Sequence, residues 1–244
     1  MSDTANHSAA IILVPGHWLG AWAWDAVAAQ LRDRGHRVVP VTLPGLDPGD
    51  PDRASRTVTD QADDLQAHVA SAASGEVRPV LVVHSGAGSP ASVLLDRDPG
   101  AVTRIVYVDS GPSADGSAFD PAFSAQQHPL PPFEQLNASL DGLSEADLAR
   151  FRARAVPEPG PVMREPVRLS NDARRDVPST IIACSYASDV MLRMASEGHP
   201  MMAEVATLRD LQVVDLPTGH WPMWSRPADL AAVISAAAVP PAAG

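Results

Sequence analysis

The feature that most constrains the fold is a regular alternation of short apolar segments with segments of helical periodicity. Short runs rich in β-branched residues are typical of buried strands, and apolar residues recur at helical spacing between most of them. Because such strands are apolar on both faces, they favour a parallel sheet covered by helices on both sides. Residues 1–244 therefore predict one doubly wound, mainly parallel α/β domain. The expected strands are residues 11–14, 37–41, 80–83, 105–108, 180–184 and 211–214.

One region interrupts this alternation. Roughly 65 residues separate the fourth and fifth expected strands, which is too long for an ordinary connection. Residues 133–140 and 144–154 predict short helices in it, the second capped by Ser144 with Asp147 three residues on. All four phenylalanines of the chain lie here, so the region forms a small satellite core, a lid over the sheet, or both. We expect a helical lid at about residues 112–177.

Composition excludes several classes of function. The formal charge is −11, and nucleic acids and anionic membranes both require a basic surface, so we expect neither as a partner. Every basic residue is arginine, and the absence of lysine excludes a Schiff base or a phosphate-loop lysine. The single cysteine, Cys184, excludes an internal disulfide and a cysteine metal cluster. We expect no cofactor, no metal and a small-molecule substrate, and leave a monomer and a homodimer both open.

The sequence also indicates where in the cell the protein is expected. No apolar stretch approaches the roughly 20 residues that a membrane-spanning helix needs. Residues 1–10 are polar and lack the apolar core of a secretory signal. We therefore expect a cytoplasmic protein.

A serine lies on a tight turn between the third strand and a helix. Residues 83–88 read Val-His-Ser-Gly-Ala-Gly, which is similar to the nucleophile elbow that presents Ser85, although Val83 and Ala87 stand where glycine is usual. The same glycines also fit a dinucleotide fingerprint over residues 86–91, with Asp109 placed as the ribose-binding acid. Both interpretations predict a site at the carboxyl ends of the strands.

A histidine on another loop favours the elbow. His220 follows the last expected strand, and Gly219 beside it allows a tight approach of the backbone. The carboxyl ends of parallel strands meet at one edge of a sheet, so His220 is expected beside Ser85. A serine hydroxyl needs a base within hydrogen-bonding distance, and an imidazole has a pKa suited to that task.

Four segments together carry a resemblance to a known family. They are residues 14–24 (Val-Pro-Gly-His-Trp-Leu-Gly-Ala-Trp-Ala-Trp), 83–88, 106–109 (Val-Tyr-Val-Asp) and 218–222 (Thr-Gly-His-Trp-Pro). The chain resembles the α/β-hydrolase superfamily, in the small single-domain group of esterases, plant methyl-ester hydrolases and hydroxynitrile lyases. The first segment is similar to the group's His-Gly-x-Trp-x-Gly-x-Trp pattern, with Pro15 where histidine is common.

The resemblance implies roles for further residues. The oxyanion hole is expected from the backbone N–H groups of His17 and Gly86. The triad acid is expected after the fifth strand, where Asp189 is the first choice. Asp109, at the end of the fourth strand, is the alternative, and Glu197 or no acid at all remain open.

The tryptophans suggest the kind of substrate. All five lie in two segments, after the first strand and after the last, and both segments flank Ser85 in the expected fold. Trp22 and Trp24 suit anchors of the first helix, whereas Trp18 and Trp221 are candidate walls of a pocket for an apolar or aromatic substrate.

These observations favour a serine esterase or lactonase that works through an acyl-enzyme. Serine at the elbow argues against epoxide-hydrolase and dehalogenase chemistry, and the absence of lysine argues against a hydroxynitrile lyase. Two alternatives remain: a small-molecule-binding protein on the same fold, and an NAD(P)-dependent oxidoreductase that uses Gly86 and Gly88.

Overall fold

The computed structural model describes residues 9–239, and its centre is a six-stranded parallel sheet. The strand order is β2-β1-β3-β4-β7-β8, and every pair of neighbours is parallel. Pro40 lies in β2, an edge strand, where the missing N–H breaks no ladder bond. All six expected strands are present, so the predicted fold class is confirmed. Their bounds are β1 Ile11–Val14, β2 Val38–Pro40, β3 Val80–His84, β4 Arg104–Val108, β7 Ser179–Ala183 and β8 Leu211–Asp215.

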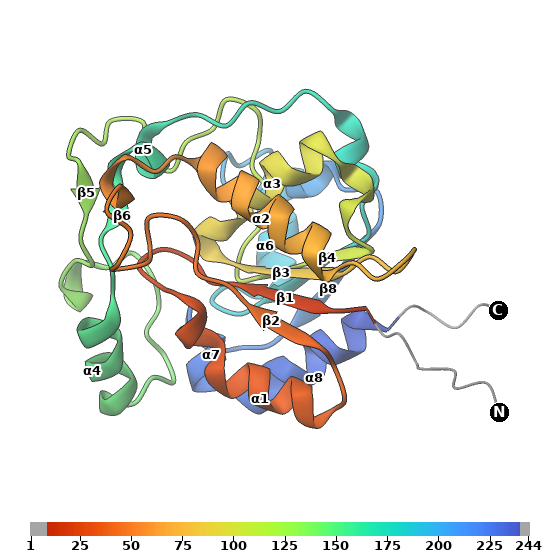
Figure 1. Cartoon of the computed structure of the whole chain (residues 1–244), viewed down its shortest axis with the longest axis horizontal. Coiled ribbons are helices and arrows are strands. Elements are labelled where there is room, and N and C mark those ends of the chain that lie inside the picture. Colours follow the sequence, from red (N-terminus) through yellow and green to blue (C-terminus); the bar gives the residue numbers. More distant parts are fainter. Residues whose placement is uncertain (1–8, 240–244) are drawn as a thin grey trace.

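Helices cover both faces of this sheet (Figure 1). One face carries α1 (Asp25–Asp33), α7 (Pro222–Ser225) and α8 (Pro227–Ala238), and the other carries α2 (Val58–Ala72), α3 (Gly88–Arg97) and α6 (Ser188–Ser196). Apolar residues at helical spacing over residues 24–31, 58–73 and 90–95 and from Pro227 onward predict α1, α2, α3 and α8, whereas no such prediction covers α6. Short 3-10 helices lie between them: η1 Ala21–Trp24, η2 Arg53–Ser55, η3 Ser85–Ala87, η4 Pro99–Ala101 and η7 Val205–Thr207.

The core consists of two apolar layers, one on each side of the sheet. Side chains of a strand point alternately to opposite faces. Ile11 and Leu13 therefore pack with α1 and α8, whereas Ile12 and Val14 pack with the layer under α2 and α3. This burial on both faces explains why the strands are continuously apolar.

Most of the insertion between β4 and β7 lies at the end of the sheet where the strands terminate, and its last part returns past α3 to the other end, where β7 begins (Figure 1). It contains a two-stranded antiparallel sheet, a capped helix and shorter helical turns. The predicted capping box of Ser144 and Asp147 is present, but the helix expected at 133–140 is only the turn η5 (Phe133–Gln135). The elements are β5 Gln127–His128, α4 Glu145–Arg154, β6 Glu158–Pro159, α5 Gly160–Arg164 and η6 Asp172–Asp176.

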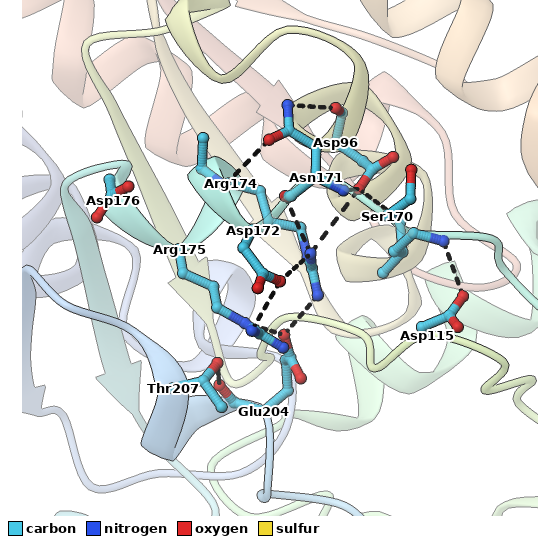
Figure 2. Close-up of polar contacts among 12 residues, drawn as sticks. Asp96, Asp115, Ser170, Asn171, Asp172, Arg174, Arg175, Asp176, Glu204 and Thr207 are labelled. Atoms are coloured by element: carbon cyan, nitrogen blue, oxygen red, sulfur yellow. Dashed lines mark hydrogen bonds and ion pairs between the residues drawn. The ribbon is translucent and has the colours of Figure 1, made fainter.

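A buried ionic cluster fastens the last part of the insertion to the domain (Figure 2). Arg174 of η6 lies between Glu204, at 2.9 Å, and Asp96 of α3, at 3.8 Å. The Asp96 carboxylate also accepts the backbone N–H groups of Ser170 and Asn171, each at 2.7 Å. This cluster determines where the chain re-enters the sheet as β7.

No helix within residues 9–239 combines the length and the apolar character that crossing a membrane requires. Most of the N-terminal segment that we expected not to be a secretory signal lies outside the described residues.

Candidate active site

Ser85 lies where β3 passes into η3 and α3, and its backbone is left-handed with φ 51°. Glycines allow the neighbouring chain segments to approach this turn. A Cβ on Gly16 would lie 2.6 Å from the Ser85 Cβ, and one on Gly88 would lie 2.3 Å from the Gly111 carbonyl oxygen. The turn therefore depends on Gly16 and Gly88, whereas Val83 and Ala87, where glycine is usual, are buried in the apolar layer.

Three polar side chains form a continuous hydrogen-bonded relay at the end of the sheet. The Ser85 hydroxyl lies 2.9 Å from Nε2 of His220, and Nδ1 of His220 lies 2.5 Å from Oδ2 of Asp109. A carboxylate only accepts, so His220 donates Nδ1–H to Asp109, and its Nε2 is free to accept the Ser85 proton. The relay can therefore activate the hydroxyl as a nucleophile.

Asp109 is held as a carboxylate. Burial opposes its ionisation, but hydrogen bonds from His220 and Ser185 outweigh burial and lower the pKa of Asp109 to about 2. Ser185 donates through its N–H at 2.9 Å and through its hydroxyl at 2.5 Å, and Cys184 N–H donates at 3.2 Å. The fixed negative charge orients the His220 ring through its Nδ1–H.

The favoured acid, Asp189, does not occupy this position. Asp189 is exposed in the first turn of α6, and no hydrogen bond within residues 9–239 joins it to His220. The helix begins at Ser188, which is fixed by hydrogen bonds to the Asp215 carboxylate. The expectation failed because α6 was not predicted, so a helical residue was taken for part of a loop. The alternative, Asp109, is the residue that contacts His220, and Glu197 lies at the far end of the same helix.

The insertion and β3 together hold the His220 backbone. His220 N–H donates to Ser139 O at 2.8 Å, and Gly219 N–H donates to Asp141 O at 3.1 Å. A Cβ on Gly219 would lie 2.6 Å from that oxygen, so only glycine fits this close contact. On the other side, His84 Nε2 lies 2.7 Å from His220 O.

His84 is a fully satisfied, uncharged imidazole. Its Nε2–H donates to His220 O, and its Nδ1 accepts Gly16 N–H at 3.3 Å. Burial, with the nearby His220 as the next cause, lowers the pKa of His84 to about 3. His84 thus points away from the Ser85 hydroxyl and ties the loop after β1 to the His220 loop.

The two expected oxyanion donors belong to adjoining segments. Gly86 directly follows Ser85, and the His17 ring lies against it, because a Cβ on Gly86 would be 2.2 Å from His17 Nε2. Glu158, which no sequence motif indicated, accepts His17 Nδ1–H at 3.1 Å and Trp18 N–H at 3.2 Å. The oxyanion roles of His17 and Gly86 stay predictions.

Comparison with known proteins identifies the family. The model of the alpha/beta hydrolase family matches residues 11–233. The chain belongs to the alpha/beta hydrolase family. Methylesterase 7 of Arabidopsis thaliana is 27% identical to it over 255 residues, which cover 94% of this chain and 96% of that protein.

Solved alpha/beta hydrolases share the fold. An extracellular alpha/beta hydrolase from a Paenibacillus species has a TM-score of 0.72 and 19% identity, covering 94% of this chain and 98% of that one. A methylesterase from Arabidopsis has a TM-score of 0.72 and 18% identity over the same shares.

In this alpha/beta hydrolase the two candidate pocket tryptophans are almost wholly buried. Trp18 is 8% exposed and donates its ring N–H to His128 O at 3.0 Å. Trp221 is 2% exposed and packs its ring against His220 and Phe151. The Trp221 ring thus adjoins the relay, whereas the Trp18 ring contacts His17, and the contact of either ring with a substrate stays a prediction.

The remaining sequence candidates are also placed. Cys184 is buried directly after β7, and burial raises the pKa of its thiol well above the usual range. Asp109, the ribose-binding acid of the dinucleotide interpretation, is engaged by His220 instead. Gly86 and Gly88 therefore belong to the elbow of an alpha/beta hydrolase.

Proposed function

We propose that this chain is a serine hydrolase that cleaves a carboxylic ester or lactone of a small apolar or aromatic substrate. The observation that carries the proposal is the continuous relay of Ser85, His220 and Asp109. The methylesterase names of the relatives support ester hydrolysis.

The geometry leads to a two-stage reaction. The Ser85 oxygen attacks the substrate carbonyl while its proton moves to Nε2 of His220. The tetrahedral oxyanion accepts hydrogen bonds from the backbone N–H groups of Gly86 and His17. Its collapse expels the alcohol, which takes the proton from His220 and leaves an acyl-Ser85. Water, deprotonated by His220, then releases the carboxylic acid and restores Ser85.

Substrate binding is assigned to the side chains around the relay. Trp18 and Trp221 are proposed as apolar walls, and Phe119 of the insertion, which is 62% exposed and lies against His17, suits a contact on the lid side. The insertion at about residues 112–177 would then act as the lid of one domain. A cytoplasmic location is part of the proposal, and cell fractionation tests it.

Active-site labelling provides the test. A fluorophosphonate probe should label the wild-type chain, and Ser85→Ala should abolish the labelling because the hydroxyl is the nucleophile. A panel of p-nitrophenyl esters of increasing chain length, with aryl lactones alongside, then defines the acyl group. An unlabelled wild type that still binds small ligands would favour a binding protein instead.

A further inference from the structure

A second imidazole lies beside the nucleophile and is not used by the relay. His17, on the loop after β1, is 8% exposed, and its partner Glu158 in β6 is 1% exposed. The Glu158 oxygen that contacts Nδ1 of His17 also accepts the N–H of Trp18, whose φ is 65°. One carboxylate of the insertion therefore fixes both the His17 ring and the backbone of the loop that carries it.

The other nitrogen of His17 is left without a partner. Nε2 is buried and makes no hydrogen bond within the described part of the chain. Burying a polar atom without a hydrogen bond costs free energy. We therefore expect Nε2 to find its hydrogen-bond partner when a substrate is bound. The nitrogen lies against Gly86, the residue whose N–H is the proposed oxyanion donor. Phe119, on the ring's outer side, is exposed enough to be displaced by a substrate.

The ion pair with Glu158 determines whether Nε2 of His17 can donate a hydrogen bond. A carboxylate accepts only, so Nδ1 of His17 carries a proton. Burying a carboxylate without a cation is expensive, and His17 is the one basic side chain within residues 9–239 that forms an ion pair with Glu158. With a second proton on His17 the pair is neutral, and Nε2–H becomes a donor that points toward the region of Gly86.

Other titratable groups near His17 do not compete for this proton. His128 of β5 and His84 of β3 face the same region. Burial lowers the pKa of both, and positive charge on His17 lowers both further. Asp109 is engaged by His220 and Ser185. Glu158 is therefore the charged group that contacts the His17 ring directly.

We infer that His17, charged through Glu158, is a side-chain hydrogen-bond donor to the carbonyl oxygen of the ester as it becomes an oxyanion. This inference rests on the proposed ester hydrolysis. It adds a charged third donor to the two backbone N–H groups, and it explains Gly86, since a Cβ there would overlap the ring. His17 then contacts the reacting atoms, and Glu158 is a positioning residue that acts through it.

The inference is tested by measuring kcat and KM for the hydrolysis of p-nitrophenyl acetate by two variants. Glu158→Gln removes the charge but keeps one oxygen that can accept both N–H groups, since His17 and Trp18 already share a single oxygen. Its kcat should fall about 10-fold or more, with KM changed far less, because the carboxylate that forms the ion pair with His17 is gone. His17→Phe keeps a planar ring without a donor, and kcat should fall about 10²- to 10³-fold at every pH, with KM changed far less.

Controls separate this inference from the proposed function. His128→Gln changes a neighbouring imidazole and should leave kcat within about twofold of wild type, and thermal melting confirms that each variant is folded. A folded Glu158→Gln that keeps kcat within about threefold of wild type excludes the charged donor. A folded His17→Phe that keeps kcat within about threefold also excludes it. Failure of the wild type to hydrolyse esters or to be labelled at Ser85 would instead overturn the proposed function.

Discussion

At the scale of single residues, strained backbone coincides with the site. Within residues 9–239, the non-glycine residues with positive φ are Trp18, Ser85 and Asp109, at 65°, 51° and 43°. Each such conformation costs on the order of 1–3 kcal/mol and persists only where the surroundings enforce it. All three belong to the relay or to the loop beside it, so packing elsewhere holds the reacting groups in position.

The acid of the relay is testable by a matched pair of substitutions. Asp109→Asn should lower kcat by about 10⁴, because an amide donates to Nδ1 of His220 and fixes the wrong tautomer. Asp189→Asn should leave kcat within about twofold, since Asp189 is exposed on α6. Steady-state hydrolysis of a p-nitrophenyl ester measures both. Equal losses in the two variants would refute the assignment of Asp109.

At the scale of elements, the insertion is what completes the site. Its residues 139–141 bind the backbone of the His220 loop, and its strand β6 supplies Glu158 to the loop after β1. Phe133 and Phe151 are buried in the apolar layer that contains α1 and α8, whereas Phe119 is exposed beside His17. Phe133 and Phe151 therefore belong to the main core and not to a satellite core, and a lid that places Phe119 over a pocket stays a prediction.

The ionic cluster at the end of the insertion predicts an unequal cost for two arginines (Figure 2). Arg174→Ala should lower the free energy of unfolding by about 3 kcal/mol, because it leaves the nearly buried Asp96 carboxylate without a cation and Glu204 with Arg175 alone. Arg209→Ala removes an exposed ion pair with Asp176 and should cost about 0–1 kcal/mol. Urea unfolding measures both values. An equal loss of unfolding free energy in the two variants would show that the ion pairs of Arg174 do not hold the insertion against the domain.

At the scale of the whole molecule, buried titratable groups link stability to pH. The folded pKa of His84 is about 3, against 6.5 for an unperturbed histidine. Between these values the unfolded chain takes up a proton that the folded chain does not. The His84 contribution to stability is therefore complete above about pH 6.5 and is lost as the pH falls toward about 3. Asp109 adds a similar loss only between its ordinary pKa of 3.8 and about 2.

His84→Gln tests this linkage. The amide can donate to His220 O and accept Gly16 N–H, but it does not titrate. The variant should be less stable than wild type near neutral pH, and the difference should shrink by on the order of a few kcal/mol at about pH 4. Urea unfolding at several pH values measures the difference, in which groups common to both proteins cancel. A difference that is constant with pH would exclude His84 as the source.

The sequence by itself determined the sheet, most of its helices and the meeting of Ser85 with His220. Continuous apolar runs identify strands buried on both faces, and parallel strands end at one edge, so residues that follow those strands meet whatever their separation along the chain. Helix α4 was likewise predictable because its capping box is local. These features depend on short-range pattern alone.

Only the tertiary structure decided between Asp109 and Asp189, and only it revealed Glu158. The position of Asp189 relative to His220 depends on where α6 begins, and Ser188 at that start is held by Asp215 of β8, which is distant in sequence. Glu158 lies in a two-residue strand that pairs only with β5 and docks on the loop after β1. Contacts of this kind arise from the packing of distant segments, so no local pattern of residues encodes them.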